Sequence, residues 1–264
     1  MKLQLAFFVL LILLISCSQE NSFPEKKSTR IPVEKLKLQP CFSQLMVDVS
    51  KANVDFSELN NFILQFETRQ ENFSLIAFEQ EWDKFRLKNN TPDWNDAALK
   101  KWINITGLLL ELTNNPKYAE ELEQINLKSG NILQYEIAPY ILTKQIDHIF
   151  VNLFLPVETS YNHTLGGELK LIQETDYPKS GSVKIHFEMT ERRYMELFIR
   201  IPSWAEGSTV SVKQVKYFAA PGTYCKIAKK WKEGDLVEIE LPVKKTHISK
   251  SEKQIKSNFI FPDA

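Results

Sequence analysis

The chain has 264 residues with 33 basic and 33 acidic side chains, so its net charge is zero when histidine is neutral. A balanced chain without a basic run is not typical of nucleic-acid-binding proteins, and we therefore expect no nucleic-acid partner. The length is sufficient for one large domain or two modest ones.

Residues 1–17 predict a secretory signal. An apolar run from Leu3 to Ile15, broken only by Gln4, is too short to cross a bilayer. It leads into Leu14-Ile15-Ser16-Cys17, which has the pattern of a bacterial lipobox. We expect cleavage before Cys17 and acylation of this residue, which would anchor the protein to a membrane. The predicted localisation is extracytoplasmic, in the periplasm or at the cell surface; an ordinary signal peptide is the alternative.

Two cysteines remain after Cys17, and they lie far apart in the sequence. Cys41 and Cys225 cannot form a tetrahedral zinc site without histidine or carboxylate ligands. A disulfide between them is compatible with an oxidising compartment, and two separate thiols are the simpler interpretation. Residues 18–40 are rich in Ser, Glu, Lys and Pro, which predicts a flexible tether without a functional site.

Apolar residues recur at helical spacing across residues 41–145, which predicts an all-helical region. One helix is expected to begin near Pro92, with Asp93 or Thr91 as its N-cap. Asn114-Asn115-Pro116 should separate this helix from the next one. The expected helical segments are 56–66, 75–85, about 92–112 and 118–125.

Beyond Ile146 the apolar period changes to two, as in strands that are half-buried in a sheet. Closely spaced runs of this kind, joined by turns with Pro and Gly, are typical of an antiparallel β-sandwich. We therefore predict an α+β chain, with a sandwich over residues 146–248 and a tail over 249–264. The expected strands are 168–175, 182–189, 195–201, 209–212, 223–227 and 236–241.

Several segments of the second half stand out by their order and spacing. They are Phe150–Pro156 (FVNLFLP), Leu171–Pro178 (LIQETDYP), Leu197–Ala205 (LFIRIPSWA), Pro221–Tyr224 (PGTY) and Lys230–Pro242 (KWKEGDLVEIELP). Together they resemble glycoside hydrolase family 127, the β-L-arabinofuranosidase-like enzymes, in which an (α/α)6 barrel precedes a β-sandwich. Upstream, Leu112–Gln124 (LTNNPKYAEELEQ) resembles the family's Leu-Thr-Gly-Asp-x-Lys-Tyr-Ala-Asp-x-x-Glu-Arg barrel helix. The resemblance implies that the helical region is a remnant of that barrel.

The resemblance also implies a zinc ion held by cysteines and a glutamate, with one bound cysteine as nucleophile and a Glu as acid/base. The family's Glu-Thr-Cys-Ala segment falls on Asn95-Asp96-Ala97-Ala98, so an amide replaces the carboxylate and a methyl replaces the thiol. Asp96 is then expected to stabilise the first turn of a helix. The paired cysteines that should precede Tyr140 have no counterpart. We therefore predict no catalytic residue, no metal site and no cofactor.

Glu174, Asp176, Tyr177 and Trp204 are candidates for glycan contact, because aromatic rings stack on sugars and carboxylates accept hydroxyl hydrogen bonds. The structural alternative is a strand end that enters a turn, with Trp204 plugging the rim of the sandwich.

Two further sets of residues are considered as sites. The four histidines show no i, i+4 pair that would suggest a metal site, and His186 is expected to face solvent. Among the helical acids, Glu79 with Glu81 or Asp83 near Trp82 could serve a glycosidase, but a solvated helix face is the usual explanation. The histidines are His148, His163, His186 and His247.

The leading hypothesis is a membrane-anchored lipoprotein related to family 127, catalytically degenerate and acting in glycan binding or processing. A complete barrel needs roughly a dozen helices of ordinary length, more than this region holds. One alternative is therefore an active hydrolase of β-L-arabinofuranosidase type, completed by a partner chain that supplies the missing helices. A second alternative is a structural surface lipoprotein without sugar affinity.

Overall fold

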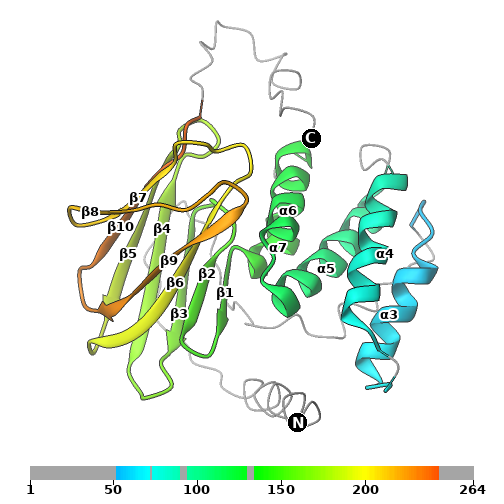
Figure 1. Cartoon of the computed structure of the whole chain (residues 1–264), viewed down its shortest axis with the longest axis horizontal. Coiled ribbons are helices and arrows are strands. Elements are labelled where there is room, and N and C mark those ends of the chain that lie inside the picture. The colour runs from blue at the N-terminus through cyan, green and yellow to red at the C-terminus, as the bar shows by residue number, and fades with distance from the viewer. Residues whose placement is uncertain (1–51, 72, 90–93, 130–133, 244–264) are drawn as a thin grey trace, which may run out of the picture.

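The computed structural model describes residues 52–71, 73–89, 94–129 and 134–243, and it shows a group of helices beside a β-sandwich (Figure 1). The predicted α+β class, with helices followed by a sandwich, is confirmed. Cys17, Cys41, His247, the tether and the tail lie outside the described residues. In the described ranges, no helix is both long and apolar enough to span a bilayer.

The helices bury an aromatic-rich face. Trp82 stacks on Trp102 with ring centroids 5.1 Å apart, and Tyr118 meets Trp82 edge-on at 4.8 Å. Such rings bury large apolar areas. The buried indole N–H of Trp82 donates a hydrogen bond to Thr106 Oγ1 at 3.0 Å. The helices are α3 (Ser57–Glu67), α4 (Leu75–Lys88), α5 (Asp96–Thr113), α6 (Pro116–Ser129), the short α7 (Gln134–Ile137) and the 3-10 turn η3 (Ala138–Tyr140).

The ends of α5 follow local side-chain chemistry. The helix begins at Asp96 rather than near Pro92, because Asn95 is the N-cap and its Oδ1 accepts a hydrogen bond from Ala98 N at 2.9 Å. It ends at Asn114, which adopts a left-handed conformation with φ of 50°. Pro116 then opens α6, so the predicted break is confirmed.

The sandwich consists of two sheets, and strands of both alternate buried with more exposed residues. The four-stranded sheet has the order β1-β2-β6-β9, and the six-stranded sheet has the order β3-β4-β5-β10-β7-β8. The strands are β1 (Leu142–Gln145), β2 (His148–Val151), β3 (Val157–Asn162), β4 (Glu168–Thr175), β5 (Ser182–Met189), β6 (Arg193–Ile201), β7 (Thr209–Val212), β8 (Val215–Tyr217), β9 (Thr223–Trp231) and β10 (Leu236–Glu240).

The structure differs from the predicted strands in three respects. β1 lies inside the range predicted to be helical, because its four residues pair with β2 in a tight hairpin and are too few to show a period. The pairing is also not wholly antiparallel, since β2 runs parallel to β6, with Phe150 opposite Phe198. The short strands β2, β3 and β8 were also not predicted.

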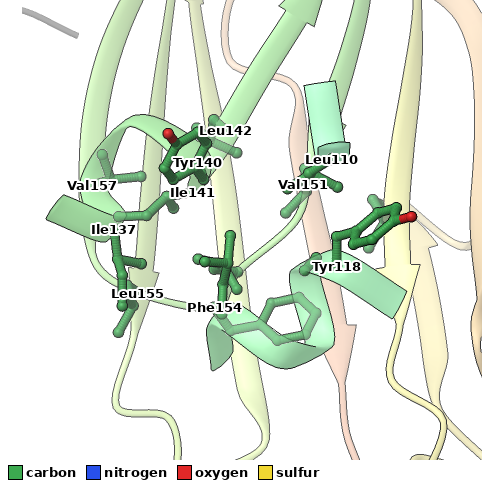
Figure 2. Close-up of a cluster of buried hydrophobic side chains, with 14 of the residues drawn as sticks. Leu110, Tyr118, Ile137, Tyr140, Ile141, Leu142, Val151, Phe154, Leu155 and Val157 are labelled. Atoms are coloured by element: carbon green, nitrogen blue, oxygen red, sulfur yellow. The ribbon is translucent and has the colours of Figure 1, made fainter. Parts of the chain in front are cut away.

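One hydrophobic core continues from the helices into the sandwich. Figure 2 shows side chains from both parts in the same cluster, among them Leu110 and Tyr118 from the helices and Val151 and Phe154 from the sandwich side. Gly107 of α5 is part of this contact, since a Cβ at that position would lie 2.0 Å from Cζ of Tyr140. The helices and the sandwich therefore pack as one body, and α6 lies beside the four-stranded sheet (Figure 1).

Candidate functional site

Two of the four predicted glycan-contact residues lie together at one end of the sandwich. Tyr177 follows β4, Trp204 follows β6, and their rings are nearly parallel, at 14°, with centroids 6.4 Å apart. Phe154 supports Tyr177 from the core side with its ring at 5.9 Å and 69°. Both rings are half-buried, so each keeps some surface in contact with solvent.

The other two predicted residues point elsewhere. Glu174 is on the outer face of the six-stranded sheet, where its Oε2 lies 3.3 Å from Nε2 of His186. Asp176 is exposed in the turn after β4, and its carbonyl oxygen accepts a hydrogen bond from Lys179 N at 2.8 Å. The site is therefore an aromatic pair with Asp176 next to it in the sequence, and Glu174 belongs to the sheet surface together with the half-exposed His186.

A buried ion pair joins α6 to the sandwich behind this aromatic pair. Arg200 Nη2 of β6 lies 2.8 Å from Glu123 Oε1 of α6, and the two side chains are 1% and 5% exposed. Arg200 Nε also donates to the carbonyl oxygen of Asn152 at 2.6 Å. Glu123 also raises the pKa of Tyr177, so the aromatic pair and the ion pair are electrostatically coupled.

Burial and charge act in opposite directions on these groups. Burial raises the pKa of Glu123, and the neighbouring Arg200 partly offsets this rise. Burial alone would lower the pKa of Arg200, but Glu123 raises it overall, so this guanidinium stays charged. Burial and Glu123 both raise the pKa of Tyr177, so this tyrosine stays a phenol. The groups are held as a buried ion pair beside a neutral tyrosine.

A second contact fixes α6 next to Trp204. Glu120 Oε1 accepts a hydrogen bond from Ser203 N at 3.2 Å and another from the Ser203 hydroxyl. Glu120 and Glu123 lie on one face of α6, one turn apart. The sequence did not predict this joint. The residues on both sides of the joint lie in segments that carry the family resemblance, Leu112–Gln124 and Leu197–Ala205. This shared resemblance was the sequence feature that could have indicated the contact.

The acidic residues near Trp82 serve the packing of the helices. Glu79 Oε1 accepts a hydrogen bond from the Tyr118 hydroxyl at 2.9 Å, and Asp83 Oδ2 lies 3.0 Å from Lys117 Nζ. Glu81 pairs with Lys84 at 3.1 Å. Each of these carboxylates therefore has a cation or a hydroxyl as its partner.

The residues that align with the family's catalytic segment have structural roles. Asn95 caps α5, and Asp96 lies in its first turn as expected. Cys225 carries a free thiol inside the sandwich, where burial raises its pKa and disfavours the thiolate. In residues 52–243, leaving out the undescribed gaps, no group of three or more His, Cys, Asp or Glu side chains could hold a metal ion.

Two histidines stabilise turns and strands. His163 is buried, with Nδ1 accepting a hydrogen bond from Leu165 N at 3.0 Å and Nε2 lying 3.1 Å from the Tyr194 carbonyl oxygen. His148 lies 3.4 Å from Glu196 on the four-stranded sheet. His163 contacts backbone atoms and His148 contacts a strand carboxylate, so both histidines have structural roles.

Comparison with protein families identifies the second half. Residues 148–243 match the family model described as beta-L-arabinofuranosidase, GH127 middle domain. This range runs from the start of β2 to just beyond β10 and contains Tyr177, Arg200 and Trp204. The β-sandwich of this chain is therefore similar to the GH127 middle domain. No curated protein gave a significant match.

Solved structures of glycoside hydrolases share this similarity. A GH127 beta-L-arabinofuranosidase from Geobacillus stearothermophilus T6 is 23% identical over 55% of this chain and 30% of that chain, with a TM-score of 0.48. A glycoside hydrolase is 24% identical over 55% and 32%, and a GH127 beta-arabinofuranosidase is 20% identical over 55% and 31%, both with TM-scores of 0.48. The chain thus spans about a third of the length of these proteins.

Proposed function

We propose that the chain is a lipid-anchored, extracytoplasmic relative of family 127 hydrolases that binds glycans without cleaving them. The proposal of glycan binding rests on the aromatic pair of Tyr177 and Trp204, whose ring centroids are 6.4 Å apart at the end of the sandwich. Flat aromatic surfaces bind the apolar faces of sugar rings. The anchor is Cys17, as the lipobox predicts.

The loss of catalysis is supported by the chemistry at the aligned positions. Asn95 offers an amide that already caps a helix, Ala97 offers a methyl group, and the Cys225 thiol is buried among sandwich residues. None of these side chains supplies the thiolate that a zinc-bound nucleophile requires. No cofactor is proposed.

A binding titration with the tryptophan variant tests the proposal. Purified chain is titrated with arabinan and with other neutral plant polysaccharides, and Trp204→Ala is expected to weaken binding about tenfold, because a stacking surface is lost. Phe218→Ala is the matched control, since Phe218 is an aromatic side chain that is 73% exposed elsewhere on the sandwich.

Thermal unfolding of both variants shows whether the fold is kept. Absence of affinity for every neutral glycan would favour the structural lipoprotein. Hydrolysis of a substrate by the purified chain, abolished by a single substitution, would contradict the proposal, because it would show that the chain is itself an active enzyme.

A further inference from the structure

The end of the four-stranded sheet farthest from Trp204 carries a cluster of basic residues around an exposed tyrosine. Tyr194 of β6 is directly opposite Lys230 of β9, and Arg193 is opposite Trp231. Because Trp231 points into the core, alternation places Tyr194 and Lys230 on the outer face. The same alternation, continued by one step, places Arg192 and Lys232 beside them.

These four residues, called the basic corner, are all exposed, and Tyr194 is 52% exposed. In an antiparallel ladder, opposite Cβ atoms are about 5 Å apart and successive residues on one face about 7 Å apart. The basic corner is therefore a small grid of three cations and one phenol. It lies at the start of β6 and at the end of the neighbouring strand β9 (Figure 1).

The carboxylates near the basic corner are already engaged. Glu191 pairs with Arg193, and Glu233 Oε2 accepts a hydrogen bond from Met189 N at 2.6 Å. Glu196 lies 2.8 Å from Lys226 Nζ. In the part of the chain that the structure describes, no carboxylate is within ion-pair distance of the cations of the basic corner.

The outer face of the six-stranded sheet is built differently. There Lys170 Nζ lies 2.6 Å from Glu158 and 3.4 Å from Glu188, so a cation is placed between two acids. Like charges opposite each other in a ladder are destabilising. Arg192 and Lys232 lie one step beyond the last paired residues of β6 and β9, so the continued alternation brings two like charges near each other. An external anion would remove the repulsion.

We propose that the basic corner binds an acidic polysaccharide, with a sugar ring on Tyr194 and its carboxylate or sulfate groups on Arg192, Lys230 and Lys232. Arginine and lysine form charge-assisted hydrogen bonds with such anions, and the tyrosine ring adds an apolar surface. The inference rests on the proposed function only for the choice of carbohydrate as ligand class. Its site is distinct, since the strand residues from Tyr194 to Ile201 alone span about 23 Å and Trp204 lies beyond that end of β6.

The test measures affinity of the purified chain for polygalacturonate. Lys230→Gln/Lys232→Gln is expected to weaken binding about tenfold, and added salt should weaken binding to the unaltered chain. Lys179→Gln/Lys216→Gln is the matched control, because it removes the same charge from exposed positions elsewhere and should change the affinity less than about twofold. Tyr194→Ala should also weaken binding. Equal losses in the two double variants would overturn the proposal.

Two further arms separate this inference from the proposed function. Trp204→Ala should leave polygalacturonate binding unchanged while it weakens binding of neutral arabinan. Polygalacturonate bound no more tightly than arabinan would overturn the inference and leave the proposed function standing. Polygalacturonate binding through the basic corner, with no neutral glycan bound, would support the inference and contradict the role of Tyr177 and Trp204. Binding to phosphatidylglycerol vesicles but not to polygalacturonate would also overturn the inference.

Discussion

The ion pair between Glu123 and Arg200 is the residue-scale feature on which the joint between helices and sandwich depends. Both charges are buried, and removing one of them leaves the other without compensation. We therefore expect Glu123→Ala to lower the free energy of unfolding by about 3–5 kcal/mol. Urea unfolding measures this change, and Glu240→Gln, at an exposed strand end, is a control expected to change stability by less than about 0.5 kcal/mol.

The double replacement Glu123→Leu/Arg200→Met separates charge from packing. Because a buried ion pair is often matched by apolar residues of similar size, the double variant should lose less stability than Glu123→Ala alone. A Glu123→Ala variant as stable as the Glu240→Gln control would show that the joint does not depend on this pair.

A second prediction at this scale concerns Glu111, one turn after Gly107 on α5. Burial raises the pKa of Glu111 to about 8, from an ordinary value of 4.5. Between these values the folded protein holds a proton that the unfolded chain releases, so this group makes stability fall as pH rises from about 4.5 through 8. Glu111→Gln should reduce the loss of stability between about pH 5.5 and about pH 8.5.

Urea midpoints of the two proteins at both pH values test this sign. The same pH dependence in the variant and in the unaltered chain would assign the effect to other groups.

At the scale of elements, the contact of α5 with η3 depends on Gly107. A helix-interior glycine replaced by alanine usually stabilises a helix by roughly 0.5–1 kcal/mol. Here the added methyl would fall on the Tyr140 ring, with 2.0 Å between Cβ and Cζ, so Gly107→Ala should instead destabilise by about 1–3 kcal/mol. Asn61→Ala on the exposed face of α3 is the control, and its stability should not fall. A stabilised Gly107→Ala would contradict this packing.

How well the elements could be predicted depended on their length and surroundings. The bounds of β4 and β5 agree with the sequence pattern, because eight alternating residues give a clear period and polar turns delimit them. β1 could not be recognised, because its four residues are defined by pairing with β2. The start of α5 was wrong by about four residues, because Asn95 is a better-placed cap than Thr91 or Asp93.

The candidate site was predictable only in part. Tyr177 and Trp204 belong to neighbouring motifs, and their proximity follows from a sandwich in which β4 and β6 end on the same side. The contact between Glu123 and Arg200 joins residues 77 positions apart in the sequence of 264 and depends on how α6 packs on the sheet, which periodicity does not report. The pairing of Glu174 with His186 depends on the register of β4 and β5.

At the scale of the whole molecule, the chain joins a GH127-like sandwich to a small helical layer through one core. Glu123 and Arg200, which build this joint, lie in two of the segments that resemble the family. Residues Asn95 to Ala98, where the resemblance places the family's catalytic segment, cap and begin α5 without a thiol or a glutamate. The proposed function uses this scaffold for binding.

The most direct test of this account is one assay on the purified chain: zinc content together with turnover of an aryl β-L-arabinofuranoside. The account predicts no stoichiometric zinc and no turnover above the uncatalysed rate. Stoichiometric zinc with turnover that is lost when the metal is chelated would contradict it, and would show that the chain is an active hydrolase with a rebuilt metal site.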